Sequence, residues 1–538
     1  MTAPSSSDRN QKRADDRRKI IRLLAFFTSI LTLLVVLYSL KPTRQESLAT
    51  AHAVNSAAHS NAPSQATGTT DAAAGATNAA AGNLPTRELL SSERLIQEAA
   101  PRKQDIDIQS WKTPKGAKVM FVEADEVPML DVRLVFNAGA ARDDKLPGLA
   151  AITNSLLDEG TPSANVDEIA RQLESIGASI GLGSYRDMAI ISLRTLTDPA
   201  YLDKALALLY DVSAHPSFPA ESLSRIRQQM LVGLEAEKQR PEATLNRVFY
   251  SVLYAGHPYG IPPSGTPESL KAITASDIAA FHSRYYVASN LVIAITGAID
   301  REKANQIASA IDNALPQGEP APALPVPKGA TASQEIRLPF ASSQTHIVVG
   351  GLSVDRRTPD WAALYVGNEI LGGGGFASRL NQIIRQDNGL AYSVYSSISP
   401  MAQAGPFTMG LQTSNETADQ ALALVNSTFK KFIAEGPTEQ ELEATKKNIL
   451  GGLPLSTANN RAIVDQLGAM AFYDLPLDYL KTLPEKIAAV TLADVRNAFA
   501  KDIASHAQIT LMVGGRAVPT IPASRAAAHS HSQEPKAP

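Results

Sequence analysis

The pattern of apolar residues predicts one long folded region between two ends of different composition. From residue 106 to residue 517, short runs of Val, Ile and Phe alternate with segments whose apolar residues recur every three or four positions. Runs of the first kind predict strands, and segments of the second kind predict helices. The pattern therefore predicts a mixed α+β fold. In the first half it predicts strands over 119–122, 132–136, 188–193 and 291–296, and helices over 166–176, 202–212 and 221–237.

The second half of this region repeats the first. In each half a Thr and an Asp three residues later precede an apolar strand that ends in glycine. The same number of residues separates three matching pairs: Thr274 and Thr491, Asp277 and Asp494, and Gly297 and Gly514. A constant separation indicates a duplicated α+β domain. We therefore expect one domain over 106–315 and a second over 331–517, joined by a Pro-rich linker over 316–330.

The N-terminus combines a basic segment, residues 1–22, with an uncharged apolar run, residues 23–40. The run is long enough to cross a bilayer as a helix. Positive charge before it predicts that the N-terminus is cytoplasmic and that the rest of the chain lies across the membrane. A cleaved signal peptide would usually have a shorter apolar core with a small-residue site directly after it. A globular helix would not explain the basic flank, so we favour an uncleaved transmembrane anchor.

Two segments are too poor in large apolar residues to form a core. Residues 41–105 are rich in Ala and Ser, and residues 518–538 consist mainly of Ala, Ser, His and Pro. Such compositions predict a disordered linker and a disordered tail. Together with the apolar run, they predict a single-pass protein of the inner (cytoplasmic) membrane, with its globular part on the periplasmic or extracellular side.

The overall composition argues against two classes of function. The formal net charge is −3 and the isoelectric point is near 6.3, so nothing suggests a nucleic-acid partner. The chain has no Cys, which removes disulfides and any thiolate zinc site.

The most informative stretch runs from residue 372 to residue 396. It opens with four consecutive glycines: Gly372, Gly373, Gly374 and Gly375. Apolar residues at helical spacing then predict a short helix near Arg385, and an Asn-Gly turn leads to a strand that carries Tyr392. Arg385 and Tyr392 should therefore point into the same space. The plainer interpretation is an Arg that caps a helix and a Tyr in the core. A phosphate loop is disfavoured because no Lys-Ser or Lys-Thr follows the glycines.

This order of features resembles the C-terminal half of the insulinase/pitrilysin family of zinc metallopeptidases, within it the mitochondrial-processing-peptidase-like subfamily. The matching features are the Gly-rich turn, S-R-L, and an Arg before the Tyr of G-L-A-Y-S-V-Y-S. The duplication over roughly residues 106–517 is similar to the family too, as is His257-Pro-Tyr-Gly260, whose role we expect to be structural.

The resemblance implies an α+β fold of two homologous α/β-sandwich domains in tandem, as in LuxS and the processing peptidases. Here one transmembrane helix and a disordered linker would precede them. It also implies that Arg385 and Tyr392 grip the substrate near the scissile bond, beside a substrate loop formed by the four glycines.

The family's metal site is missing from the matching stretch of this chain. Active members carry H-x-x-E-H on a helix, where two His bind zinc and the Glu activates water. The segment G-L-A-A-I-T-N-S-L-L-D-E-G-T matches the flanks of that motif, but places Ala151 and Ser155 at the His positions and Asn154 at the Glu position. The third ligand position aligns with Gly233, with Glu235 and Glu237 nearby but displaced. We therefore expect this chain to bind no metal and no other cofactor.

Some enzymes of the family are heterodimers in which one subunit carries H-x-x-E-H and the other carries the Arg/Tyr pair. The resemblance implies that this chain is the second kind, active only with a zinc-binding partner of the same family and acting on a peptide substrate. The alternative is a non-catalytic scaffold or peptide-binding protein with the same fold.

Overall fold

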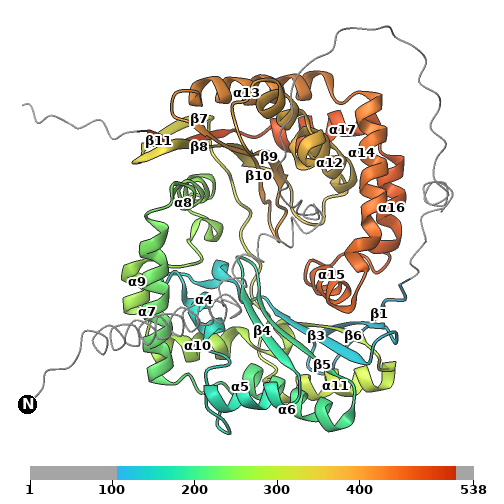
Figure 1. The fold of residues 1–538 in the computed structure, drawn as a ribbon. Coiled ribbons are helices and arrows are strands. Elements are labelled where there is room, and N and C mark those ends of the chain that lie inside the picture. The colour runs from blue at the N-terminus through green and yellow to red at the C-terminus, as the bar shows by residue number, and fades with distance from the viewer. Residues whose placement is uncertain (1–105, 516–538) are drawn as a thin grey trace, which may run out of the picture. The chain divides into compact units, whose positions relative to one another are not determined.

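A computed structural model describes residues 106–515 of the chain, which fold around two β-sheets (Figure 1). The predicted anchor at 23–40, linker at 41–105 and tail at 518–538 all lie outside the described residues and stay predictions. Among the described residues no helix is both long and apolar enough to cross a membrane.

The first half confirms the predicted strands and helices and adds elements that the sequence pattern did not predict, among them β1 and β4. Its elements, with η for short 3-10 or π-helical segments, are β1 (Gln109–Lys112), β2 (Lys118–Glu123), β3 (Met129–Phe136), η1 (Ala140–Arg142), α4 (Leu149–Ser155), α5 (Val166–Ser175), β4 (Ser179–Ser184), β5 (Ala189–Leu196), α6 (Pro199–Ala214), α7 (Ala220–Glu237), α8 (Pro241–Leu253), η2 (Pro258–Gly260), α9 (Pro267–Ala272), α10 (Ala275–Tyr285), η3 (Ala288–Asn290), β6 (Leu291–Gly297) and α11 (Arg301–Ala314).

The second half begins after a stretch without helix or strand between α11 and β7. Its elements are β7 (Gln334–Pro339), β8 (Ser342–Leu352), α12 (Trp361–Asn368), η4 (Glu369–Gly373), η5 (Gly375–Ala377), η6 (Asn381–Asp387), β9 (Val394–Ile398), β10 (Pro406–Ser414), α13 (Ala418–Glu435), α14 (Glu439–Gly452), η7 (Leu453–Thr457), α15 (Asn460–Phe472), α16 (Tyr479–Ala489), α17 (Leu492–Phe499), η8 (Ala500–Ala504) and β11 (Ile509–Gly515).

The two sheets share one topology, which confirms the predicted tandem arrangement. Their strand orders are β1-β2-β6-β3-β5-β4 and β7-β11-β8-β10-β9. Each contains one parallel pair, β2 with β6 and β7 with β11, beside antiparallel strands. Matching the pairs equates β4 with β9 as corresponding edge strands, and leaves β1 as an extra strand of the first sheet.

The repeated Thr and Asp residues have the same structural role in both halves. Thr274 caps the start of α10 by accepting a hydrogen bond from the Asp277 backbone N–H at 3.2 Å, and Thr491 caps α17 by accepting one from Asp494 at 3.2 Å. Each Asp carboxylate accepts a bond back from the backbone N–H of its Thr. This reciprocal capping satisfies two backbone donors at a helix start, and it explains why both residues recur.

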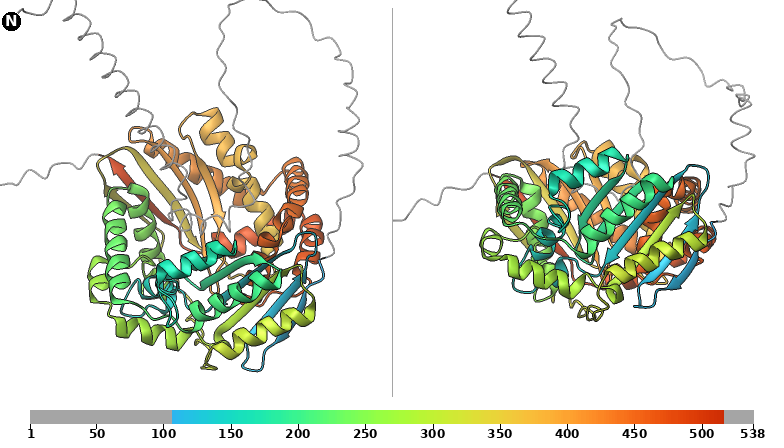
Figure 2. Two further views of the ribbon diagram at one scale, coloured as in Figure 1. Left: turned by 60° about the horizontal axis from the view of Figure 1, so that its bottom comes forward. Right: turned by 90° about the horizontal axis from the view of Figure 1, so that it is seen from below.

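Each sheet packs one face against helices of its own half. Helices α5, α6 and α11 lie across one face of the first sheet, and α12, α13 and α17 lie on one face of the second (Figures 1 and 2). Buried Val, Ile, Leu and Phe side chains fill both interfaces. Burial of this apolar surface is the main source of stability in such layers.

The other face of each sheet is covered by a helix from the opposite half. Helix α15 of the second half packs on β2, β3 and β6, with Leu467 and Met470 against Met120 and Val135. Helix α8 of the first half packs on β8 and β11, where Phe249 is almost completely buried. This exchange of helices gives the two halves two shared cores, so they form one structural unit.

Candidate functional site

The glycine-rich turn joins two π-helical segments instead of entering a regular α-helix. Gly372 and Gly373 end η4, and η6 takes the place of the predicted α-helix. Gly375 has a φ of 59°, in the region that favours glycine. Gly372 is required for another reason, because a Cβ there would lie 2.4 Å from the backbone nitrogen of Ser396 in β9. The turn is thus packed directly against the edge strand.

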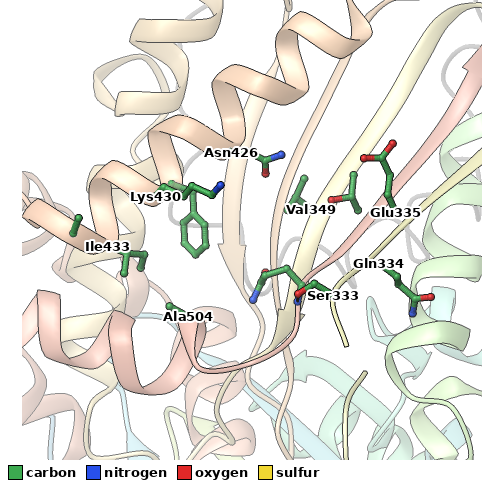
Figure 3. A pocket seen from close by; sticks show the side chains of 12 residues that line it. Ser333, Gln334, Glu335, Val349, Asn426, Lys430, Ile433 and Ala504 are labelled. Carbon is green, nitrogen blue, oxygen red and sulfur yellow. Dashed lines mark hydrogen bonds between the residues drawn. The ribbon is translucent and has the colours of Figure 1, made fainter. Parts of the chain in front are cut away.

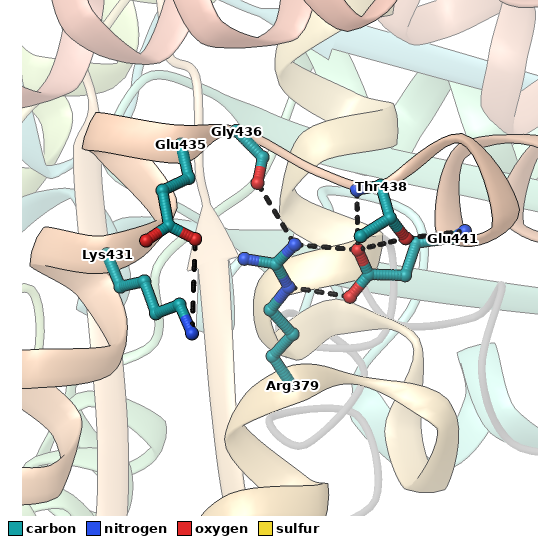
Figure 4. A network of polar contacts seen from close by, with 6 residues as sticks. All are labelled: Arg379, Lys431, Glu435, Gly436, Thr438 and Glu441. Atoms are coloured by element: carbon teal, nitrogen blue, oxygen red, sulfur yellow. Dashed lines mark hydrogen bonds and ion pairs between the residues drawn. The ribbon is translucent and has the colours of Figure 1, made fainter.

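Arg379 of the S-R-L motif fixes this turn to α14 (Figure 4). Its guanidinium makes two bonds of 2.6 Å to the Glu441 carboxylate and one of 3.0 Å to the Gly436 carbonyl. Glu441 also accepts bonds from Thr438 at the start of α14. Burial would raise the pKa of Glu441, but the bonds from Arg379 and Thr438 outweigh it and lower the pKa to about 2. Arg379 therefore has a structural role.

Arg385 and Tyr392 lie in contact, as their spacing predicts. The guanidinium carbon of Arg385 is 4.9 Å from the centre of the Tyr392 ring. The side chain of Tyr392 is 78% exposed, so it is not a core residue. One detail of the prediction was wrong: Tyr392 precedes β9, which begins at Val394, instead of lying within a strand. Its position in a bend turns the ring out toward solvent and over Arg385.

A second aromatic residue, Phe376, was missed by the sequence analysis. Its ring centre is 4.5 Å from the guanidinium carbon of Arg385, and 67% of the residue is exposed. Arg385 therefore contacts two exposed rings, and among the described residues its side chain makes no ion pair or hydrogen bond. The signal was a large aromatic residue directly after the glycines, but sequence alone did not tell whether it would be buried.

The helix that corresponds to the family's metal motif is α4, and hydrogen bonds to Asp143 anchor its start. Buried Asp143 accepts 2.7 Å bonds from the backbone N–H groups of Gly148 and Ala150 at the start of α4. Burial raises the pKa of Asp143 to about 7, although these two bonds act in the opposite direction. Asp143 thus anchors the start of α4.

The three motif positions on α4 have side chains unsuited to zinc. Asn154 is buried, and its amide donates to the Ile190 carbonyl at 3.4 Å and to the Tyr286 hydroxyl at 3.3 Å. Ala151 has no ligand atom, and Ser155 offers a neutral hydroxyl that is a poor zinc ligand. Asn154 holds α4 against β5 and α10, which is a structural task.

The position aligned with the third ligand is on α7. Gly233 is exposed, and no heavy atom lies within 4 Å of a Cβ built there. Of its acidic neighbours, Glu235 pairs with Lys238 at 2.7 Å. Between residues 106 and 515 there is no group of three or more His, Asp or Glu side chains placed to hold a metal ion.

Comparison with known proteins places this geometry in a family. A model described as insulinase (peptidase family M16) matches residues 118–266, and a model described as the peptidase M16 inactive domain matches residues 272–449. The non-peptidase homolog YmxG of Helicobacter pylori is 30% identical over 412 residues, which cover 75% of this chain and 91% of the relative. The chain belongs to peptidase family M16.

The chain is also similar to a further relative and to two solved structures. An uncharacterized zinc protease of Mycobacterium leprae is 25% identical over 360 residues, covering 66% of this chain and 80% of the relative. The crystal structure of a peptidase M16 inactive domain from Pseudomonas fluorescens is 40% identical with a TM-score of 0.74, covering 77% of this chain and 98% of that one. A protease structure from Helicobacter pylori, 17% identical with a TM-score of 0.70, shares the fold.

In this M16 chain the His257–Gly260 segment helps to join the two halves. The Tyr259 hydroxyl donates a 2.5 Å bond to the Asp187 carboxylate, which also accepts from the Ala402 backbone N–H at 2.8 Å and the Tyr473 hydroxyl at 3.2 Å. Ala402 lies in the loop between β9 and β10. We call Asp187, Tyr259, Ala402 and Tyr473 the Asp187 network. The bond from Tyr259 confirms that the His257–Gly260 segment has a structural role. The Asp187 network itself was not predicted.

A cavity of about 580 Å³ lies elsewhere in the second half, between α13, β7 and the turn before β11 (Figure 3). Its lining combines apolar side chains, among them Val349, Phe429 and Ile433, with polar ones, among them Glu335, Asn426 and Lys430. Neither Arg385 nor Tyr392 lines this cavity, so it is separate from the candidate site.

Proposed function

We propose that this chain is the non-metal subunit of an M16 zinc peptidase. A partner of the same family would carry H-x-x-E-H and the zinc ion, and this chain would present Arg385 and Tyr392 to the peptide. One combined observation carries the proposal: half-buried Arg385 contacts the exposed ring of Tyr392, while α4 lacks side chains suited to holding a metal. In this proposal the chain would supply the substrate-binding part of the site, and the partner would supply the metal-binding part.

The chemistry of the pair suits binding of a peptide carbonyl group. The guanidinium of Arg385 is a planar fork of N–H donors, and the Tyr392 hydroxyl is a further donor. When bound in the partner, zinc would activate the attacking water. Negative charge then grows on the carbonyl oxygen, and positioned donors stabilise it more strongly than they stabilise the starting carbonyl. Arg385 and Tyr392 would in this way lower the barrier from across the subunit interface.

Membrane attachment belongs to the same proposal. The basic segment 1–22 and the uncharged run 23–40 support a single-pass anchor in the inner membrane. The linker at 41–105 would then separate the M16 unit from the bilayer on the periplasmic or extracellular side. The partner would be expected in the same compartment.

A second candidate function is supported by the same exposed side chains. An Arg flanked by aromatic rings can bind peptides without any cleavage, and a relative of this chain is named a non-peptidase homolog. In that case the chain would be a peptide-binding or scaffold protein. The two functions differ in whether a zinc-bearing partner is required.

Co-purification followed by a peptidase assay tests the proposal. The full chain is isolated from its source membranes with an affinity tag, and associated proteins are searched for H-x-x-E-H. The proposal expects a zinc-containing M16 partner, with peptidase activity that the isolated subunits lack. A chain that purifies without such a partner, or a complex with no peptidase activity, would favour the peptide-binding function.

A further inference from the structure

The Phe376 ring is exposed although it is large and apolar. It lies in η5, directly after Gly375, and 67% of the residue is accessible. Tyr392 is also exposed and contacts the same guanidinium. Exposed aromatic residues gathered at one point of a surface often mark a binding site.

The backbone that carries Phe376 is held at both ends. The Gln386 side chain donates a 2.8 Å bond to the Phe376 carbonyl. The Ser378 hydroxyl donates a 2.7 Å bond to the Gly375 carbonyl, and the Gly374 N–H donates a 2.8 Å bond to the Glu369 carbonyl. These bonds fix the turn relative to η4 and η6. The ring is therefore presented from an ordered turn, which lowers the entropy cost of binding something to it.

The guanidinium of Arg385 lies over both rings. Its guanidinium carbon is 4.5 Å from the Phe376 centroid and 4.9 Å from the Tyr392 centroid. Cation–π attraction stabilises the guanidinium against the faces of these rings. Its N–H groups lie in the guanidinium plane, so they remain available as hydrogen-bond donors. An acceptor bound by those N–H groups would thus lie beside the rings.

We propose that Phe376 is a specificity-determining residue that selects peptides with an apolar side chain next to the carbonyl group bound by Arg385. The inference rests on the proposed function, because it assumes that Arg385 binds a peptide carbonyl. In an extended peptide the side chain of the adjacent residue projects beside that carbonyl. Contact between an apolar side chain and the exposed Phe376 ring removes apolar surface of both from water. Gly has no side chain and Ser has a small polar one, so neither can bury as much apolar surface.

The test measures peptide binding by the full chain without any zinc-bearing subunit. The probes are two fluorescein-labelled ten-residue peptides of Gly and Ser that are identical except for one central residue, Phe or Ser. Fluorescence anisotropy gives the Kd of each. We expect the wild-type chain to bind the Phe peptide at least fivefold more tightly than the Ser peptide. Phe376→Ala should reduce this ratio to about one, and Phe376→Leu should keep most of it.

Tyr201→Ala is the matched control, because Tyr201 is another exposed aromatic residue and lies in α6, outside the site. It should leave the Kd ratio unchanged. Melting curves of all variants separate loss of the site from loss of the fold. A Phe376→Ala chain that is folded and keeps the wild-type ratio overturns the proposal, and so does a wild-type chain that does not prefer the Phe peptide.

The Arg385→Ala variant separates failure of this inference from failure of the proposed function. If both stand, Arg385→Ala weakens both peptides and Phe376→Ala removes only the preference. If Arg385→Ala leaves both Kd values unchanged while Phe376→Ala removes the preference, Arg385 is not the carbonyl-binding group. The proposed function then fails, whereas the apolar preference of Phe376 remains.

Discussion

The Tyr473 hydroxyl, at the end of α15 in the second half, donates a 3.2 Å hydrogen bond to the Asp187 carboxylate of the first half. Asp187 is buried and has two further donors, the Tyr259 hydroxyl and the Ala402 backbone N–H. This buried carboxylate accepts bonds from three donors, which come from both halves. Removing it lowers the free energy of unfolding, because each buried donor that loses its acceptor has been desolvated without a hydrogen bond in return. The Asp187 network thus joins the halves in addition to the exchanged helices.

Replacing Asp187 should destabilise the whole unit. Asp187→Ala leaves two buried hydroxyl groups and one backbone N–H without their acceptor, so we expect the free energy of unfolding to fall by about 2–4 kcal/mol. Urea unfolding followed by circular dichroism measures the loss. Tyr473→Phe removes a single bond and should cost about 1 kcal/mol. If both substitutions change the free energy of unfolding by a negligible amount, the network does not join the two halves.

Stability should depend on pH through His282. This buried residue bonds the Ser213 carbonyl at 3.0 Å and stacks on Tyr286, with His215 as a nearby titratable group. Burial lowers the pKa of His282 to about 4. The unfolded chain therefore takes up its proton near pH 6.5, before the folded chain does. As pH falls from about 6.5 to 4, the free energy of unfolding should drop by roughly 3 kcal/mol.

The control for this pH effect uses two variants. His282→Gln keeps a donor for the Ser213 carbonyl but cannot titrate, so it should lower stability at neutral pH and flatten the slope between pH 6.5 and 4. His215→Gln changes a half-exposed histidine and should leave the slope in place. Urea midpoints of the wild type and both variants, measured across this pH range, show whether His282 causes the pH dependence. An unchanged slope in His282→Gln would show that another group causes the pH dependence.

The chain should bind no stoichiometric zinc. Ala151, Asn154 and Ser155 occupy the positions at which the family motif supplies two ligands and a base. Metal analysis of the purified chain after dialysis should give well below one zinc per chain. An M16 protein that carries H-x-x-E-H, treated in the same way, is the positive control. One tightly held zinc per isolated chain would require a site outside the family motif.

The sequence predicted the repeated parts of the fold because their signals are local. The Thr and Asp pairs directly encode the caps of α10 and α17, and the turn between Arg385 and Tyr392 brings those side chains together. The packing of α8 and α15 on the sheet of the opposite half was not predictable. An apolar helix face predicts that the helix packs against a sheet, but not which of the two sheets. Edge strand β4 was missed because Gly181 and Gly183 interrupt its pattern with residues that disfavour strands.

The site itself was only partly predictable for similar reasons. Residue types and spacing predicted that Arg385 and Tyr392 lie together, which the structure confirms, whereas their role and the absence of a metal site on α4 stay predictions. The contribution of Phe376 depends on exposure and on a turn fixed by hydrogen bonds from η6, which no local pattern reveals. The π-helical form of η6 was also not encoded in the apolar spacing, since a π-helix and an α-helix place apolar residues at similar intervals.

Residues 23–40 should remain in the mature protein. The basic flank before an uncharged run favours a retained anchor over a cleaved signal peptide. N-terminal sequencing of the protein from the membrane fraction should therefore find a start before residue 23. Extraction should require detergent, because a single apolar span resists removal by salt. A mature start after residue 40 would show that the run is a signal peptide.

The most direct test of the account is steady-state kinetics of the assembled complex carrying Arg385→Ala or Tyr392→Phe. If these side chains stabilise the developing negative charge, each change should lower kcat by roughly 100–1000-fold, equivalent to about 2.7–4 kcal/mol. Because Tyr392 is exposed and half-buried Arg385 contacts only exposed rings, the melting temperature and the assembly of the proposed complex should stay close to wild type. A complex that assembles normally and keeps near-normal kcat and KM with both substitutions would contradict the central claim.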